Sequence, residues 1–293
     1  MRLLLALILL AAGQVFATPL QSTYKGLVLN ANLIEPEQVE PEHSSDDMPT
    51  GRIFLLVHGT WGHNEMEIIS GLQHSLAANG QTSLAINLSL GQSDRRGFMS
   101  CDGPINANHA DAAGEIDHWV NYLMSRWPHV VLVAHSRGGN QAMLYNQQYG
   151  SAAVEATVLI APMTWNQASA AQAYSEKYHV DLNAVLDQAR QDSQQMMTAD
   201  LLQCPQVNVR ASSLLSYYAT QPNRNTPDLL ANTERPVLVF EGSEDPMAKD
   251  FAAQTEKFAA NKLVTVLWIE GSDHFFRDLY IDDVVEHTLQ WLQ

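Results

Sequence analysis

The chain contains few cysteines and few basic residues, and beyond its first residues it has no long apolar run. Its 293 residues include only two cysteines, and 16 Lys and Arg stand against 32 Asp and Glu, a formal net charge of −16. Nucleic acids and anionic lipid surfaces attract cationic proteins, so this charge argues against both as partners. The length, with 46% hydrophobic residues, fits one large globular domain.

The only extended apolar run, at the start of the chain, has the pattern of an export signal. Arg2 precedes the apolar residues, and Val15-Phe16-Ala17 has the small-x-small pattern of a cleavage site. From Leu3 to Phe16 this segment has fourteen residues, whereas a membrane-spanning helix needs about 20. We therefore expect a signal peptide, residues 1–17, cut after Ala17, and a periplasmic or secreted protein with no integral membrane segment after cleavage. The alternative is an uncleaved membrane anchor.

Export changes the meaning of the two cysteines. In an oxidising compartment Cys101 and Cys204 can form one disulfide across a sequence separation of 103 residues. Two buried or free thiols are the alternative, because the sequence does not give the distance between them. A cysteine metal site needs more ligands than these two residues supply, so we expect no metal.

Buried strands and helices alternate along the chain. Ile53–Val57, Val130–Ala134 and Pro236–Phe240 are continuous apolar runs, typical of parallel strands buried on both faces. The alternation predicts an α/β fold with a mostly parallel central sheet and helices on both faces. The other expected elements are strands at 24–29, 83–88, 153–161 and 263–269, and helices at 64–79, 111–126, 138–149, 248–260 and 279–292.

Residues 163–235 interrupt this alternation with helical pieces but no buried strand. Ligand sites in open α/β sheets lie at the carboxyl ends of strands, so an insertion there predicts a lid. A helical excursion without a role at the site is the alternative. The expected organisation is a signal peptide (1–17), a first part of the core (18–162), a helical cap (163–235) and a second part of the core (236–293).

The segment Ala134-His135-Ser136-Arg137-Gly138 lies where a buried strand is followed by a helix. Small residues at its ends let strand and helix approach each other around a serine in a strained conformation. The segment resembles the Gly-x-Ser-x-Gly nucleophile elbow of the α/β-hydrolase superfamily, with Ala134 in place of the first glycine. This resemblance implies the α/β-hydrolase fold and makes Ser136 the candidate nucleophile.

A serine hydroxyl needs a base and an orienting acid, which follow the serine in the order acid, then histidine, in this superfamily. Asp245 ends Gly242-Ser243-Glu244-Asp245 after a buried strand, which resembles the family's Gly-x-x-Asp turn. His274 ends Gly271-Ser272-Asp273-His274 after the next strand, which resembles the closing Gly-x-x-His segment. The resemblance therefore assigns Asp245 and His274 to a triad with Ser136. Three neighbouring acids lack the family spacing: Glu241, Glu244 and Asp273.

The resemblance also implies an oxyanion hole. One donor is the backbone N–H of Arg137, the residue after the nucleophile. The second comes from the loop His58-Gly59-Thr60-Trp61-Gly62, where Gly59 lets the backbone approach the substrate. We assign this donor to Thr60, with Trp61 as the competitor, and give His58 the structural role of orienting the loop.

Side chains next to these residues are candidates for substrate binding. His135 flanks the serine, Phe275 follows His274, and Trp61 lies in the oxyanion loop, so we expect these three to contact substrate. For the aromatic residues, including Trp165 and Phe276, packing in the core is the alternative.

Arg95 and Arg96 lie in a loop that borders the active site in this superfamily. We expect a surface pair, with contact to an anionic substrate group as the alternative.

Together these features predict an exported serine hydrolase that cleaves carboxylic esters through an acyl-enzyme, without a metal or organic cofactor. The expected substrate is a small-molecule or lipid-like ester. A thioesterase or a lipase-like hydrolase is the alternative within the superfamily. A catalytically silent domain used for binding is the alternative from another class, and the presence of all three triad residues disfavours it. The oligomeric state stays open.

Overall fold

The computed structural model describes residues 17–36, 51–221 and 224–293. Except for Ala17, the expected signal peptide lies outside these residues. Among the residues that the structure describes, no helix has the length and apolar character needed to cross a membrane.

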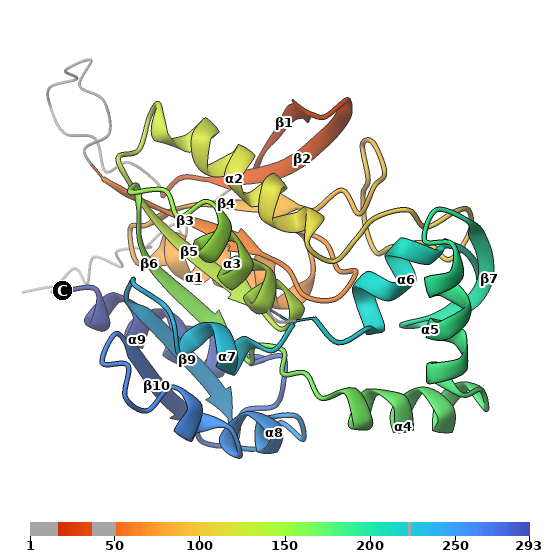
Figure 1. Cartoon of the computed structure of the whole chain (residues 1–293). Coiled ribbons are helices and arrows are strands. Elements are labelled where there is room, and N and C mark those ends of the chain that lie inside the picture. Colours follow the sequence, from red (N-terminus) through yellow and green to blue (C-terminus); the bar gives the residue numbers. More distant parts are fainter. Residues whose placement is uncertain (1–16, 37–50, 222–223) are drawn as a thin grey trace, which may run out of the picture.

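An eight-stranded sheet forms the centre of the molecule (Figure 1). Its strands are β1 (Thr18–Tyr24), β2 (Leu27–Ile34), β3 (Arg52–Val57), β4 (Thr82–Asn87), β5 (His129–His135), β6 (Val154–Ile160), β9 (Val237–Gly242) and β10 (Val264–Ile269). They lie in the order β1-β2-β4-β3-β5-β6-β9-β10. β2 is antiparallel to both of its neighbours, and the pairs from β4 to β10 are parallel. The sheet is therefore mostly parallel, as predicted.

Helices cover both faces of the sheet. They are α1 (Glu67–Ala78), α2 (Asp111–Met124), α3 (Arg137–Gln148) and α9 (Leu279–Trp291), with the shorter α8 (Ala248–Ala252) and the 3₁₀ helix η1 (Thr255–Lys257) near one edge. α2 packs against α3 on one face, and α1 packs against α9 on the other. Successive strand residues point to opposite faces, so Leu55 and Leu132 join the core under α2 and α3, whereas Phe54 and Val131 join the core under α1 and α9.

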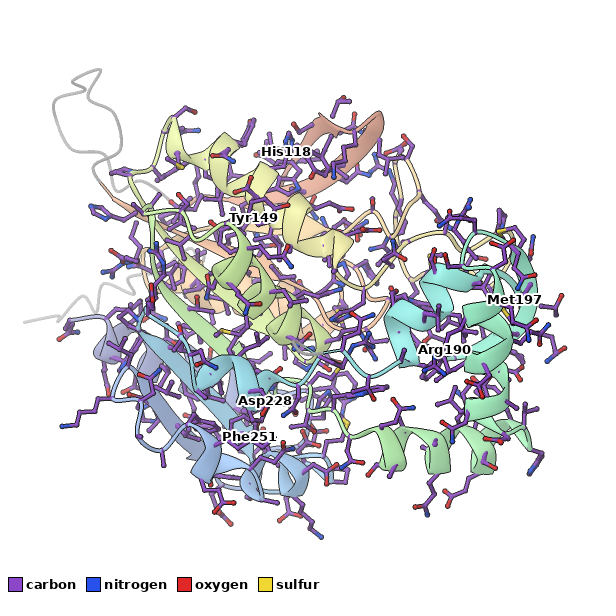
Figure 2. All side chains as sticks on the ribbon, in the orientation of Figure 1. His118, Tyr149, Arg190, Met197, Asp228 and Phe251 are labelled. Carbon is purple, nitrogen blue, oxygen red and sulfur yellow. A yellow bond between two sulfur atoms is a disulfide. The ribbon has the colours of Figure 1, made fainter. Side chains whose placement is uncertain are left out.

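The insertion between β6 and β9 contains a β-hairpin that the sequence did not predict. Its elements are α4 (Gln167–Tyr178), α5 (Leu182–Gln191), β7 (Met196–Leu201), β8 (Cys204–Arg210), α6 (Ala211–Tyr218) and α7 (Thr226–Leu230). β7 and β8 pair in antiparallel register. Polar residues alternate with apolar ones in these strands, so they lack the continuous apolar run of the central strands. Figure 2 marks this lobe beside the sheet with Arg190 on α5 and Met197 on β7.

The cap is joined to the main core by packing and by covalent and backbone bonds. Leu186 of α5 and Leu214 of α6 belong to the same apolar cluster as the sheet face under α2 and α3. Cys101 and Cys204 form a disulfide with Cα atoms 5.4 Å apart, which connects the 89–110 loop to the start of β8. Next to it, Ile105 pairs with β8, accepting from Arg210 N–H and donating to the carbonyl of Asn208, each at 2.9 Å.

Two smaller predictions were wrong. Residues 24–29 are not one strand, because Lys25 and Gly26 both have positive φ and form the turn between β1 and β2. The single helix expected at 248–260 is divided into α8 and η1. In both places the apolar residues have the spacing of one continuous element, but a turn in the backbone divides it.

Candidate active site

Ser136 occupies a sharp turn between β5 and α3. Its φ of 54° and ψ of −122° are unusual for a residue with a side chain, and such strain is typical of nucleophile elbows. The turn brings α3 close to the end of β3. A Cβ atom on Gly138 would lie 2.4 Å from the carbonyl oxygen of His58, so this position requires glycine. The small residue expected from the motif is therefore needed for packing.

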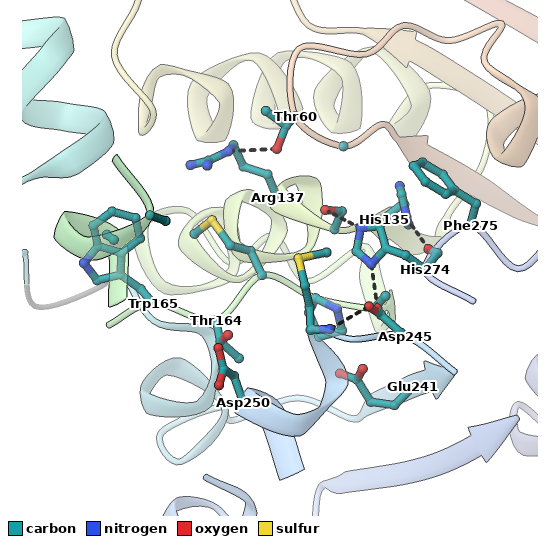
Figure 3. A pocket seen from close by; sticks show the side chains of 18 of the residues that line it. Thr60, His135, Arg137, Thr164, Trp165, Glu241, Asp245, Asp250, His274 and Phe275 are labelled. Atoms are coloured by element: carbon teal, nitrogen blue, oxygen red, sulfur yellow. Dashed lines mark hydrogen bonds and ion pairs between the residues drawn. The ribbon is translucent and has the colours of Figure 1, made fainter. Parts of the chain in front are cut away.

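Ser136, His274 and Asp245 form a continuous hydrogen-bonded relay (Figure 3). The Oγ of Ser136 lies 3.1 Å from Nε2 of His274, and Nδ1 of His274 lies 2.6 Å from Oδ2 of Asp245. The serine follows β5, the aspartate follows β9 and the histidine follows β10. Three residues that span 138 positions of the sequence thus meet at one edge of the sheet.

Asp245 is buried, with 3% of its surface exposed. Burial favours the neutral acid, but hydrogen bonds from His274 and from the backbone N–H of Met247 outweigh it and hold the pKa of Asp245 below its usual value. The carboxylate is therefore ionised at neutral pH. It fixes Nδ1 of His274 as the protonated nitrogen and leaves Nε2 free to accept from Ser136.

The loop after β3 is held against the elbow by His58. Leu88 N–H donates to Nε2 of His58 at 3.1 Å, so Nδ1 carries the proton and donates to the carbonyl of Gly59 at 2.9 Å. Burial lowers the pKa of His58 to about 3, and the ring stays neutral. A Cβ atom on Gly59 would lie 3.1 Å from Cβ of Ser136, so a glycine allows this close approach. These contacts agree with the structural role expected for His58.

A cavity of about 550 Å³ opens onto the relay. Its walls include Ser136 and His274 of the core and Trp165 at the base of the cap. Thr60 and Arg137, the expected oxyanion residues, line the same cavity, and Oγ1 of Thr60 accepts from Nε of Arg137 at 3.0 Å. Apolar side chains make up much of the remaining wall: Met66, Phe98, Met163, Met247 and Phe275.

The amino-acid sequence also matches a known family of proteins. Residues 54–286 match the sequence model of the alpha/beta hydrolase family. The chain belongs to this family. No curated protein sequence has significant similarity to it.

Solved α/β-hydrolase structures share the fold across almost the whole chain. The structure of Est1E from Butyrivibrio proteoclasticus with bound ferulic acid has a TM-score of 0.65 and 17% identity, covering 93% of this chain and 99% of the other. Dienelactone hydrolase from Anabaena variabilis has a TM-score of 0.56 and 14% identity, covering 96% and 98%. At these identities the similarity shows the fold alone.

Of the three side chains expected to bind substrate in this α/β-hydrolase, two line the cavity. His135 and Phe275 both do so. Burial lowers the pKa of His135 to about 3, and its neutral ring also contacts the carbonyl of His274 through Nε2 at 2.9 Å. His135 thereby holds the loop that carries the histidine of the relay.

Trp61 does not line the cavity, so its expected contact with substrate was wrong. Its indole is 2% exposed, and Nε1 donates to the hydroxyl of Tyr217 on α6 at 3.2 Å. Trp61 therefore fastens the oxyanion loop to the cap. Phe276 is likewise part of the core, whereas Trp165 lines the cavity.

The prediction that Arg95 and Arg96 both lie at the surface is wrong for Arg95 and confirmed for Arg96. Arg95 is 5% exposed and donates to five acceptors, including the carbonyls of Leu88 and Gly62. It joins the oxyanion loop to the loop after β4. Arg96 lies at the surface and pairs with Asp94 at 3.1 Å.

Glu241 lines the cavity, a placement that the sequence did not suggest. From the sequence, Glu241 was only an alternative to Asp245 as the acid that orients the histidine. Its side chain is 1% exposed, and Oε1 has no hydrogen-bond partner among the residues that the structure describes. Burial, with a smaller effect from Asp245, raises the pKa of Glu241 to about 9, so this acid is neutral at pH 7. The signal available in sequence was an acid inside a buried strand, β9.

Glu241→Gln is expected to stabilise the protein above about pH 5. The folded pKa lies above the unfolded value of about 4.3, so unfolding releases a proton between these two values and the stability of the natural chain falls as pH rises through the window. Glutamine has no such loss. The gain in unfolding free energy should grow from near zero at about pH 4 to roughly 3 kcal/mol at pH 7, measured by urea unfolding at several pH values.

The matched control is Glu244→Gln, an exposed acid in the same turn. It should show no gain that increases with pH. A difference between Glu241→Gln and the natural chain that is constant from acid to neutral pH would contradict the proposed neutral state of Glu241.

Proposed function

We propose that the protein is an exported serine hydrolase that cleaves carboxylic esters. The observation that carries this proposal is the relay in which Ser136 Oγ, His274 and Asp245 are joined by hydrogen bonds of 3.1 and 2.6 Å. The serine lies at a strained elbow and faces a cavity large enough for a small ester.

In the acylation step, Ser136 Oγ attacks the ester carbonyl and His274 Nε2 takes its proton. Asp245 stabilises the imidazolium that forms. The tetrahedral intermediate then collapses, the bond from carbonyl carbon to alkoxy oxygen breaks, and His274 returns the proton to the leaving alcohol. Ser136 is left as an acyl ester.

In the deacylation step, water attacks the acyl carbonyl while His274 accepts one of its protons. The bond to Ser136 Oγ breaks, the proton returns to the serine, and the carboxylic acid leaves. During both steps the backbone N–H groups of Arg137 and Thr60 would stabilise the oxyanion, each by about 3 kcal/mol. Support for this assignment is that both residues line the cavity beside Ser136.

Export is supported by two independent features. The first seventeen residues have the signal-peptide pattern. The disulfide between Cys101 and Cys204 belongs to a class of bond that persists in oxidising compartments such as the periplasm or the cell exterior.

A fluorophosphonate tests the serine assignment directly, because only an activated serine displaces its fluoride. Intact mass should show one adduct on residues 18–293 and none on Ser136→Ala. Unlabelled, folded natural protein would contradict the proposal, as would labelling that survives in the variant. The labelled enzyme should also lose its activity on short-chain p-nitrophenyl esters, which connects the adduct to ester cleavage.

A further inference from the structure

Two buried arginines lie beside the candidate active site, and neither has an acidic partner within the described ranges of the chain. Arg137 is 8% exposed and Arg224, just before α7, is 2% exposed. The Nη1 atoms of both are enclosed and have no hydrogen-bond partner among the residues that the structure describes. Buried charged groups are normally paired, because leaving them without a partner is costly.

The surroundings of the two guanidinium groups supply aromatic rings instead of carboxylates. Arg137 lies 5.5 Å from the centre of the Tyr217 ring, and Arg224 lies 5.0 Å from that of Trp165. Burial raises the pKa of Tyr217, so its phenol is neutral at pH 7. Within the described part of the chain, the groups that act electrostatically on Arg224 are Arg137 and Tyr217, and neither carries a negative charge at pH 7.

Arg224 lies behind the wall of the catalytic cavity, against the ring of Trp165. Arg137 and Trp165 line this cavity, and Nε1 of Trp165 is a third enclosed donor without a described partner. In Figure 3 the guanidinium of Arg137 lies on the side of Thr60 that faces away from His274, the side on which Trp165 is drawn. An anion that enters the cavity therefore meets the part of the wall formed by Arg137 and Trp165, which lies at a distance from the Ser136 hydroxyl.

We propose that Arg137 and Arg224 bind a carboxylate group carried by the substrate, so that the enzyme prefers monoesters of dicarboxylic acids to neutral esters. Guanidinium groups bind carboxylates through charge-assisted, often bidentate hydrogen bonds. The net charge of −16 disfavours polyanions, whereas a single small carboxylate meets a local positive site. This inference rests on the proposed hydrolase function, because it names the substrate of the same cavity.

The first test measures binding without turnover. Ser136→Ala is titrated by calorimetry with the monomethyl esters of glutaric to suberic acid, and with the matching dimethyl esters, which have similar length and no charge. At least one monoester should bind about 10- to 100-fold more tightly than its dimethyl counterpart. Equal or weaker binding of every monoester would overturn the proposal.

The second test locates the carboxylate site. Arg224→Met retains an unbranched apolar stem over Trp165 but removes the charge, and should reduce the monoester preference about tenfold. Arg190→Met is the matched control, since Arg190 is an exposed cap residue paired with Asp187, and it should leave the preference unchanged. A preserved preference in Arg224→Met would overturn the assignment. If Arg224→Met fails to fold by circular dichroism, Arg224→Lys, which keeps the charge without the planar fork, should still weaken the preference, and an unaltered one would contradict it.

The outcomes distinguish this proposal from the hydrolase proposal. Monoester binding without a fluorophosphonate adduct would leave an anion site in a domain that is not a serine hydrolase. An adduct without monoester preference would retain the hydrolase and remove the carboxylate site.

Discussion

Ser136→Ala is expected to lower the turnover of a short-chain p-nitrophenyl ester by about 10⁴- to 10⁶-fold. The alanine removes the hydroxyl oxygen that lies 3.1 Å from Nε2 of His274. Asp245→Asn should lower turnover by about 10⁴-fold, because an amide cannot hold the imidazole in the required tautomer or stabilise its charge. Initial rates at equal protein concentration measure both effects.

Because the three residues act as a unit, their effects should not add. The double variant Ser136→Ala with Asp245→Asn should be no slower than Ser136→Ala alone. Ser193→Ala, at an exposed serine of the cap, is the control and should retain the natural rate. If Ser136→Ala kept more than about a hundredth of the natural rate, the acyl-enzyme mechanism would be wrong.

Loss of the disulfide is expected to reduce the free energy of unfolding by about 4 to 5 kcal/mol. The bond joins residues 103 positions apart, so it removes much of the conformational freedom of the unfolded chain. The variant is Cys101→Ser with Cys204→Ala, since Cys101 is exposed and Cys204 is 0% exposed. Urea unfolding of the purified variant and of the natural chain gives the difference.

The natural chain in reducing agent is the control for this experiment. Its stability should fall towards that of the double variant, while the reducing agent should not alter the variant itself. The backbone of β7 and β8 should also lose protection from hydrogen exchange first, because the bond ties this hairpin to the 89–110 loop. An unchanged unfolding midpoint in the variant would show that the bond does not contribute to stability.

The sequence by itself determined the fold class and the relay. Apolar runs such as Ile53–Val57 and Val130–Ala134 are typical of strands buried on both faces of a sheet, and they form β3 and β5. Ser136, Asp245 and His274 were identifiable because each follows such a strand within a short local motif. Parallel strands end at the same edge of the sheet, so the order of the motifs already placed the three side chains together.

Local patterns were weaker where a turn or a partner strand decided the structure. The β1–β2 turn at Lys25 and Gly26 and the β7–β8 hairpin depend on backbone pairing that apolar periodicity does not reveal. Export favoured a disulfide between the two cysteines but left free thiols as the alternative, because the distance between them depends on where the cap lies.

Only the tertiary structure decided what the polar and aromatic residues around the relay do. Trp61 and Arg95 come from segments next to the site, yet both are buried and connect loops to their neighbours. Glu241 and Arg224 lie far from Ser136 in sequence, and the fold places the first in the cavity wall and the second behind it, beside Trp165. Whether a charge is solvated, paired or left without a partner depends on groups brought together from distant parts of the chain, and this is the information that a local motif lacks.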